Sequence, residues 1–161
     1  MLQNKTVDLL SKVKLFQGLT SADIGKMAKS FQRLSFSRGQ MLLEEGGASP
    51  GLNIITDGEL KVFLPKEIKG KSEERVSEIT LNHLKAGDWF GEYSTISNML
   101  SSSSIQAVSS GELLHCSPEH FKAFLASDDR IAKVVYYNIL QQLLERFRER
   151  ESEYDCVLVM S

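Results

Sequence analysis

The residues best suited to chemistry lie in one short stretch, residues 87–92, which read GDWFGE. Gly87 and Asp88 are typical turn residues, and two aromatic residues lead from them to Gly91 and Glu92. A Gly-Glu turn can direct backbone N–H groups and one carboxylate into the same small volume. N–H groups hold an anion, and a carboxylate accepts hydrogen bonds from sugar hydroxyls. The stretch therefore predicts a site for a phosphorylated sugar.

Basic residues are missing from the region that follows. A phosphate site usually includes an arginine, because the planar guanidinium group binds phosphate through two hydrogen bonds. Between Glu92 and Glu119 the sequence has no arginine or lysine, and residues 101–104 are four serines. A phosphate would therefore depend on hydroxyl and amide groups, or on a basic residue from elsewhere.

Composition and length favour a single globular domain. The 161 residues are enough for a sizeable core, and 19 basic residues against 21 acidic ones argue against a dedicated nucleic-acid binder. No apolar run is long enough to cross a membrane, and the N-terminus lacks the features of a signal peptide. Cys116 and Cys156 lack the spacing of a metal site or a disulfide framework. We therefore expect a cytoplasmic protein with free thiols and with neither nucleic acid nor membrane as partner.

Catalytic and metal-binding patterns are not found. The histidines are His83, His115 and His120, and none forms a metal-binding pair such as H-x-H. His115 stands beside Cys116, but a lone histidine and cysteine at a strand end are usually structural. We therefore expect no enzyme activity, no catalytic residue, no metal site and no resident cofactor.

The order of sequence patterns is helix, many short strands, helix. Thr20 and Asp23 have the spacing of a capping box, and an apolar helical face follows them. Between residues 34 and 114, short alternating runs are separated by glycine turns, which predicts a sandwich or a jelly-roll barrel. Asp57 and Gly58 between two such runs predict a two-residue hairpin. Residues 66–78 are polar and predict a solvated loop.

The C-terminal region predicts two helices. Ser117 and Pro118 have the types that begin a helix, and a longer helix should run from about residue 129 to Glu153. That helix would be about 35 Å long, more than a small barrel can cover. Its apolar stripe comprises Ile131, Val134, Val135, Ile139, Leu140, Leu143, Leu144 and Phe147. The stripe predicts a homodimer through this helix; the alternative is that it packs on its own barrel.

The predicted organisation has four parts. Residues 1–33 form an N-terminal helical segment, residues 34–116 the barrel, residues 117–153 the C-terminal helices, and residues 154–161 an apolar tail. The tail could close over the barrel mouth as a lid, or it could be the beginning of a segment that belongs to a longer protein. The fold class is mainly β with flanking α: a double-stranded β-helix, or jelly-roll, barrel between helices.

The ordered motifs resemble the cyclic-nucleotide-binding domain family, which includes catabolite-activator-type bacterial regulators and regulatory subunits of cyclic-AMP-dependent kinases. The resemblance covers roughly residues 13–150. It is carried by residues 13–19 (VKLFQGL), 36–40 (FSRGQ), 44–46 (EEG), 52–62 (LNIITDGELKV) and 87–92 (GDWFGE). Each motif is weak alone, but their order and spacing together are specific. Together with the strand pattern, the resemblance implies an eight-stranded jelly roll over about residues 34–114, with Trp89 and Phe90 turned partly into the core.

The resemblance implies a role for each matching residue. Gly91 would present its amide to the cyclic phosphate, and Glu92 would hold the ribose 2′-hydroxyl, while Tyr93 and Ser94 begin a short helical turn with further amides. The arginine that binds phosphate in the family falls at Ser101, and the small residue after it at Ser102. The sequence also departs from the family at Gly47 and Pro50, where aspartates are frequent.

Two functions remain open from the sequence. In one, the chain is a regulatory module that binds cAMP or cGMP with an affinity weakened by the missing arginine. In the other, the barrel no longer binds a cyclic nucleotide and acts in dimerisation or protein interaction. No DNA-binding motif follows the long helix, so no output domain is visible in the sequence.

Overall fold

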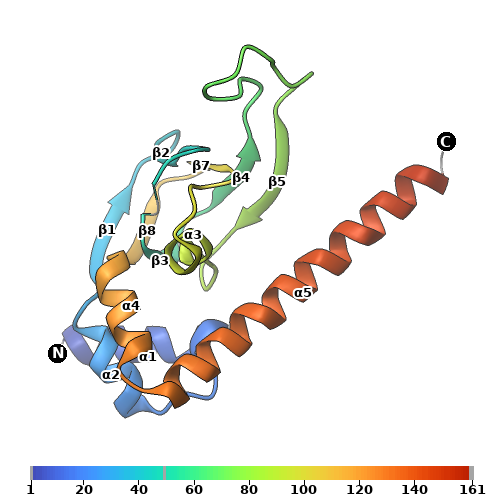
Figure 1. Ribbon diagram of the computed structural model, residues 1–161. Coiled ribbons are helices and arrows are strands. Elements are labelled where there is room, and N and C mark those ends of the chain that lie inside the picture. The colour runs from blue at the N-terminus through green and yellow to red at the C-terminus, as the bar shows by residue number, and fades with distance from the viewer. Residues whose placement is uncertain (1, 49, 160–161) are drawn as a thin grey trace.

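The computed structural model describes residues 2–48 and 50–159, and it has three parts in chain order (Figure 1). The N-terminal part contains helices α1 (Leu2–Ser11) and α2 (Ser21–Ala28), with a short 3₁₀ helix, η1 (Lys14–Phe16), between them. A barrel of strands follows, interrupted by the short helix α3 (Glu92–Ser97). Helices α4 (Pro118–Ala126) and α5 (Asp129–Val159) end the described chain.

The strands form two antiparallel four-stranded sheets, which confirms the predicted jelly-roll fold. One sheet has the order β1-β8-β3-β6 and the other β2-β7-β4-β5. Strand bounds are β1 Gln32–Phe36, β2 Met41–Leu43, β3 Leu52–Asp57, β4 Leu60–Leu64, β5 Ile79–Leu84, β6 Trp89–Phe90, β7 Ser104–Ala107 and β8 Gly111–Cys116. Successive strands alternate between the sheets at several points, so the barrel is closed by crossovers.

The predicted hairpin at Asp57 and Gly58 is wrong. Strand β3 pairs with β6 and β8, whereas β4 pairs with β5 and β7, so the turn between them carries the chain from one sheet to the other. Gly58 has a φ of 89°, and a Cβ atom there would lie 2.8 Å from the carbonyl oxygen of Ser110. The local sequence therefore predicted a glycine turn correctly, but the pairing partners of the two strands are set by the rest of the barrel.

Two apolar cores stabilise the molecule, one inside the barrel and one between the barrel and the helices. Phe90 belongs to the first and Trp89 to the second, because adjacent residues of a strand point to opposite faces. Their side chains are 6% and 3% exposed, which confirms the prediction that both turn inward. Strand β6 thus leads directly from both cores into the Gly91–Glu92 corner.

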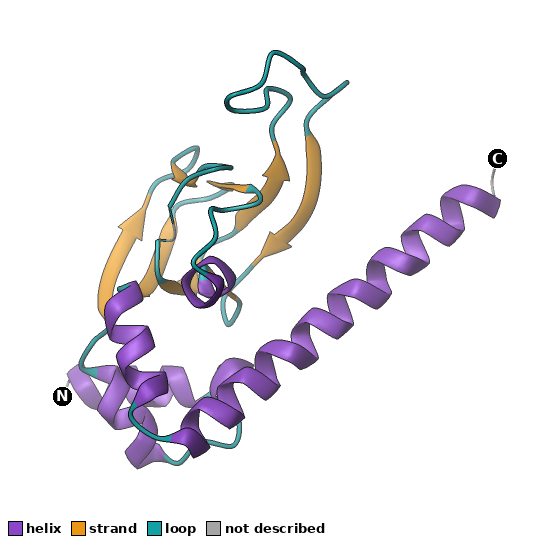
Figure 2. Cartoon of the chain, viewed as in Figure 1, coloured by secondary structure: helices purple, strands orange, loops and turns teal. Residues whose placement is uncertain are grey.

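The helix starts agree with the sequence patterns. Thr20 and Asp23 form both hydrogen bonds of a capping box, and Ser117 caps α4 with Pro118 in its first turn. The helices gather at one end of the barrel, and α5 runs from there past the strands until its C-terminal end stands clear of them (Figure 2).

Helix α5 is longer than predicted. The sequence placed its end near Glu153 and a tail after it, but the helix continues to Val159. Residues 154–159 therefore extend the helix, and they form no separate lid over the barrel; residues 160–161 lie outside the described part of the chain. At 1.5 Å per residue, the 31 residues of α5 span about 46 Å.

Candidate functional site

The candidate site begins at the corner between β6 and α3. Gly91 occupies this corner with φ 91° and ψ −5°, a left-handed conformation that favours glycine. A Cβ atom at this position would also collide with the carbonyl oxygen of Gly51. Both observations explain why a glycine precedes Glu92, the first residue of α3.

A cavity of about 470 Å³ opens beside this corner, and we call it the β6–α3 cavity. All six residues that the sequence nominated for ligand binding line it: Gly91, Glu92, Tyr93, Ser94, Ser101 and Ser102. The cavity also has an apolar wall, formed by Leu43, Val62, Leu81, Leu84, Met99, Leu100 and Ile105. The two halves of the nominated site, 92–94 and 101–102, therefore face one space, and their role toward a ligand remains a prediction.

Glu92 is the most unusual polar residue of the cavity. Its side chain is only 1% exposed, and its Oε1 atom makes no hydrogen bond of normal geometry with a described residue. Burial raises the pKa of the Glu92 carboxyl from 4.5 to about 7, while its own backbone N–H, the charge of Arg146 and the nearby Trp89 and Tyr93 side chains favour ionisation to a smaller extent. The neighbouring Trp89 indole nitrogen is also buried without a partner of normal geometry. A buried carboxyl with an unused oxygen is suited to receive a hydroxyl donor.

Ser101 is held in place by the backbone of the β2–β3 loop. Its N–H donates to the carbonyl of Gly47 (2.8 Å), and its own carbonyl accepts from the N–H of Gly46 (2.7 Å). The Ser101 hydroxyl donates to the carbonyl of Ser103 at 2.8 Å, so its proton is directed at the protein. The hydroxyl of Ser94 similarly points to the carbonyl of Gly91, at 3.5 Å. These hydroxyls can still accept hydrogen bonds, but they bring no charge to the cavity.

The sequence reasoning missed two residues of the cavity, Arg146 and Arg150 on α5. A nitrogen of Arg146 lies 3.4 Å from the Tyr93 hydroxyl, and one of Arg150 lies 3.3 Å from the carbonyl of Leu81. Their spacing of four residues puts both on one face of the helix. That spacing was visible in the sequence, but the distance along the chain from Tyr93 hid where the face points.

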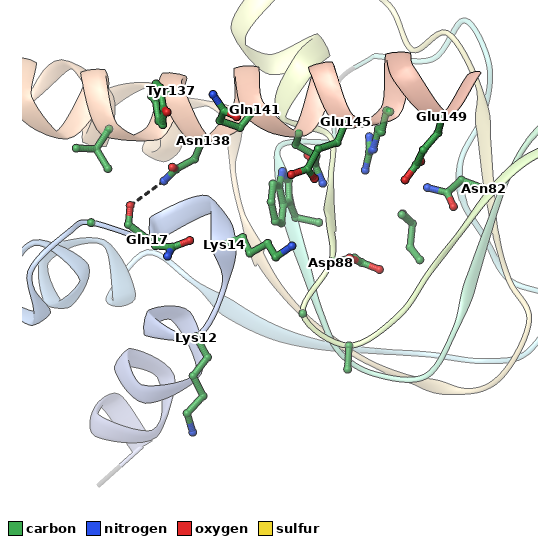
Figure 3. A pocket seen from close by; sticks show the side chains of 18 of the residues that line it. Lys12, Lys14, Gln17, Asn82, Asp88, Tyr137, Asn138, Gln141, Glu145 and Glu149 are labelled. Atoms are coloured by element: carbon green, nitrogen blue, oxygen red, sulfur yellow. Dashed lines mark hydrogen bonds between the residues drawn. The ribbon is translucent and has the colours of Figure 1, made fainter. Parts of the chain in front are cut away.

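A second and larger space, the helix groove, separates the middle of α5 from the barrel and the N-terminal helices. It measures about 1240 Å³, and Figure 3 shows Lys14 and Asp88 on one side of it, facing Glu145 of α5. The side-chain amide of Asn138 spans the end of the groove and donates to the carbonyl of Gln17 at 2.9 Å. Helix α5 is therefore anchored at its base and separated from the barrel by the groove along its middle, before Arg146 and Arg150 contact Tyr93 and Leu81.

The sequence of residues 33–128 matches the family described as "Cyclic nucleotide-binding domain". This chain belongs to the cyclic nucleotide-binding domain family. The match begins in β1 and extends beyond α4, so it includes the whole barrel and the β6–α3 corner.

Similar proteins agree with this assignment. The chain is 28% identical to a cyclic AMP receptor protein of Thermus thermophilus, over 89% of this chain and 61% of that protein. It is 28% identical to a cGMP-dependent protein kinase of Caenorhabditis briggsae, over 81% of this chain and 17% of the kinase. A crystal structure of a cyclic nucleotide-binding domain from Methylobacillus flagellatus superimposes with a TM-score of 0.75, at 26% identity, over 99% of this chain and 84% of that one. The chain thus spans less than two thirds of the length of these two curated relatives.

Two cationic side chains of the barrel strands lie outside the cavity and are paired with carboxylates. Arg33, on β1, pairs with Glu112 at 2.7 Å, and Lys61, on β4, pairs with Glu78 at 2.6 Å. Neither lines the β6–α3 cavity, where the cationic side chains among the lining residues are those of α5. No group of three or more potential metal ligands occurs among residues 2–48 and 50–159. Within the same ranges, every helix is too short or too polar to cross a membrane.

Proposed function

We propose that this chain is a regulatory ligand-binding module whose β6–α3 cavity binds a cyclic nucleotide, cAMP or cGMP. The observation that carries the proposal is Glu92, a buried carboxyl with an unpartnered oxygen in a cavity that all nominated residues line. A ribose hydroxyl would donate to that oxygen, and the apolar wall would pack on the base. A resident cofactor and a catalytic step have no part in this function.

The affinity in this proposal is low. Ser101 stands where resembling proteins carry an arginine, and a charge-assisted hydrogen bond contributes about 1.5–3 kcal/mol. Replacing a bidentate guanidinium by serine should therefore weaken binding by roughly two orders of magnitude or more, since 1.4 kcal/mol corresponds to a factor of ten. We expect a dissociation constant above about 100 µM for cAMP.

Calorimetric titration with cAMP and with cGMP tests this proposal. The variant Ser101→Arg should tighten binding at least tenfold, because the backbone of Ser101 is fixed at the edge of the cavity. Adding Glu92→Ala to that variant should loosen binding again, because the hydroxyl acceptor is lost. Absence of binding by both the wild type and Ser101→Arg would contradict the proposal. It would favour the alternative, a barrel that acts only in dimerisation or protein interaction.

We also propose that the module is a homodimer through α5. Leu140 and Phe147 are 52% and 61% exposed, and Leu143 and Leu144, which lie between them in α5, are 42% and 45% exposed. Their spacing puts these four large apolar side chains on one face of α5, and a second copy of the same helix would cover that face. The cytoplasm suits such a module, because Cys116 and Cys156 are free thiols.

A further inference from the structure

The β6–α3 cavity takes its positive charge from α5 rather than from the barrel. Of the side chains that line it, the cationic ones are Arg146 and Arg150, which lie one helical turn apart. The barrel contributes serines, apolar groups and the carboxyl of Glu92. An anionic ligand in this cavity would therefore meet guanidinium groups only along the helix.

Both guanidinium groups make only long contacts within the protein. The other buried or bridging arginines make short charged contacts: Arg75 reaches Glu45 at 2.7 Å and 3.0 Å, and Arg130 reaches both oxygens of Asp23 at 2.9 Å. Arg146 makes no such ion pair with a described residue, and its hydrogen bond to the Tyr93 hydroxyl is long, at 3.4 Å. It can change partner at small cost.

Arg150 is similarly available. Its Nε atom lies 4.0 Å from Glu153, whose side chain is 73% exposed, and its other contact is with the backbone carbonyl of Leu81 at 3.3 Å. An exposed ion pair at this distance contributes little, because water screens it. Glu149 also lines the cavity and carries a negative charge, so the phosphate of a ligand must outcompete the carboxylates of α5 for the two arginines.

We infer that Arg146 and Arg150 neutralise the anionic group of the ligand, in place of the arginine that position 101 lacks. The inference rests on the proposed function, since it names the residues that hold the charged part of a cyclic nucleotide. Both arginines reach the cavity from α5, where they contact the Tyr93 hydroxyl and the carbonyl of Leu81, and Glu92 remains the acceptor for the sugar. The charge of the ligand would then be sensed by the same helix that carries the exposed apolar residues.

Paired titrations with a nucleotide and a nucleoside test this inference. The single tryptophan, Trp89, lines the cavity, so its indole N–H resonance can report weak binding in NMR titrations up to millimolar ligand. The variant Arg146→Gln/Arg150→Gln should weaken cAMP or cGMP at least tenfold and change adenosine or guanosine less than twofold, because the nucleosides lack the phosphate. The variant Arg146→Lys/Arg150→Lys, which keeps both charges, should retain most of the affinity for the nucleotides.

Arg148→Gln is the matched control. Arg148 lies on the same helix, is exposed and does not line the cavity, so this variant should change neither ligand more than twofold. Equal loss with Arg148→Gln would mean that only the net charge matters, which overturns the inference. Unchanged nucleotide affinity in Arg146→Gln/Arg150→Gln would also overturn it, while the proposed function stands.

A further background separates the two proposals. In Ser101→Arg the phosphate already has a guanidinium partner, so removing the α5 arginines should cost less than in the wild type. Binding by Ser101→Arg with none by the wild type would overturn the inference, and it would also limit the proposed function to chains that carry an arginine at position 101. Absence of binding in both would overturn the proposed function and the inference with it.

Discussion

The two halves of α5 each place an arginine near a buried carboxyl, with opposite results. At the base, Arg130 holds Asp23 at 2.9 Å, and the pKa of Asp23 is lowered to about 2 by the Thr20 hydroxyl and by Arg130. Further along, Arg146 makes no ion pair with Glu92, and burial raises the pKa of that carboxyl to about 7. The base is thus a satisfied structural contact, whereas the far half keeps unsatisfied charge. Unsatisfied polar groups of this kind are typical of binding sites.

Apolar contacts follow the same division. Ile131 and Val135 are fully buried in the core that joins the helices to the barrel, and Ile139 is 6% exposed. One residue later, Leu140 is 52% exposed, and Leu143, Leu144 and Phe147 are exposed as well. Stability should therefore depend on the base of α5, and binding on its far half.

The largest expected effect compares two truncations on the same helix. Ile131→Ala should lower the free energy of unfolding by about 3 kcal/mol, because it leaves a cavity in a closed core. Leu140→Ala should lower it by less than about 1 kcal/mol, since half of that side chain is already in water. Urea denaturation measures both values. Equal losses would mean that the two halves of α5 are equally involved in the protomer fold.

A second prediction concerns pH and Glu92. Well below pH 4.5 the carboxyl is protonated in both the folded and the unfolded chain, so its ionisation makes no difference to stability. As the pH rises from 4.5 to 7, the unfolded chain ionises first, and the folded state should lose about 3 kcal/mol relative to it. Above pH 7 the loss is complete. Chemical denaturation across this range measures it, and Glu92→Gln should remove that part of the pH dependence.

The corresponding test at the base has the opposite sign. Because the pKa of Asp23 is lowered from 3.8 to about 2, its contribution to stability is present above pH 4 and is lost as the pH falls toward 2. Arg130→Gln should cost about 1 kcal/mol at pH 7, because it removes two charge-assisted contacts whose donor is half exposed and screened by water. It should also make the acid loss smaller. Lys133→Gln, an exposed change one turn along, serves as its control. If the stability of Arg130→Gln falls at low pH as much as that of the wild type, then Arg130 does not contribute to the lowered pKa of Asp23.

Local signals in the sequence were enough to predict the helix starts and the barrel. The capping box of Thr20 and Asp23 and the serine-proline start of α4 depend on residues within four positions of one another, and both are confirmed. The glycine-separated alternation predicted short strands in a sandwich or barrel, and the family resemblance added their number, eight. The Gly91–Glu92 corner could be located because its backbone conformation requires glycine.

The errors arose where distant residues decide the outcome. The turn at Gly58 has the residues of a hairpin, but the pairing of β3 and β4 with other strands is a property of the closed barrel. The end of α5 was set too early, at the change to apolar residue types after Glu153. Residues 154–159 contain no glycine or proline that would stop a helix, so the helix continues to Val159. The place of Arg146 in the cavity depends on the angle at which α5 leaves its base, which helical periodicity does not determine.

The smallest expected effect on the protomer, and the sharpest test of the far half, is Leu143→Glu combined with Leu144→Glu. Both side chains are more than 40% exposed, so their replacement should change the stability of a single protomer by less than about 1 kcal/mol. The homodimer should nevertheless be lost, because two pairs of like charges would replace the apolar contact between copies. Analytical ultracentrifugation at tens of micromolar should find a dimer for the wild type and a folded monomer for the variant. A monomeric wild type would show that α5 does not form a homodimer, and the exposed apolar residues would then need a different partner.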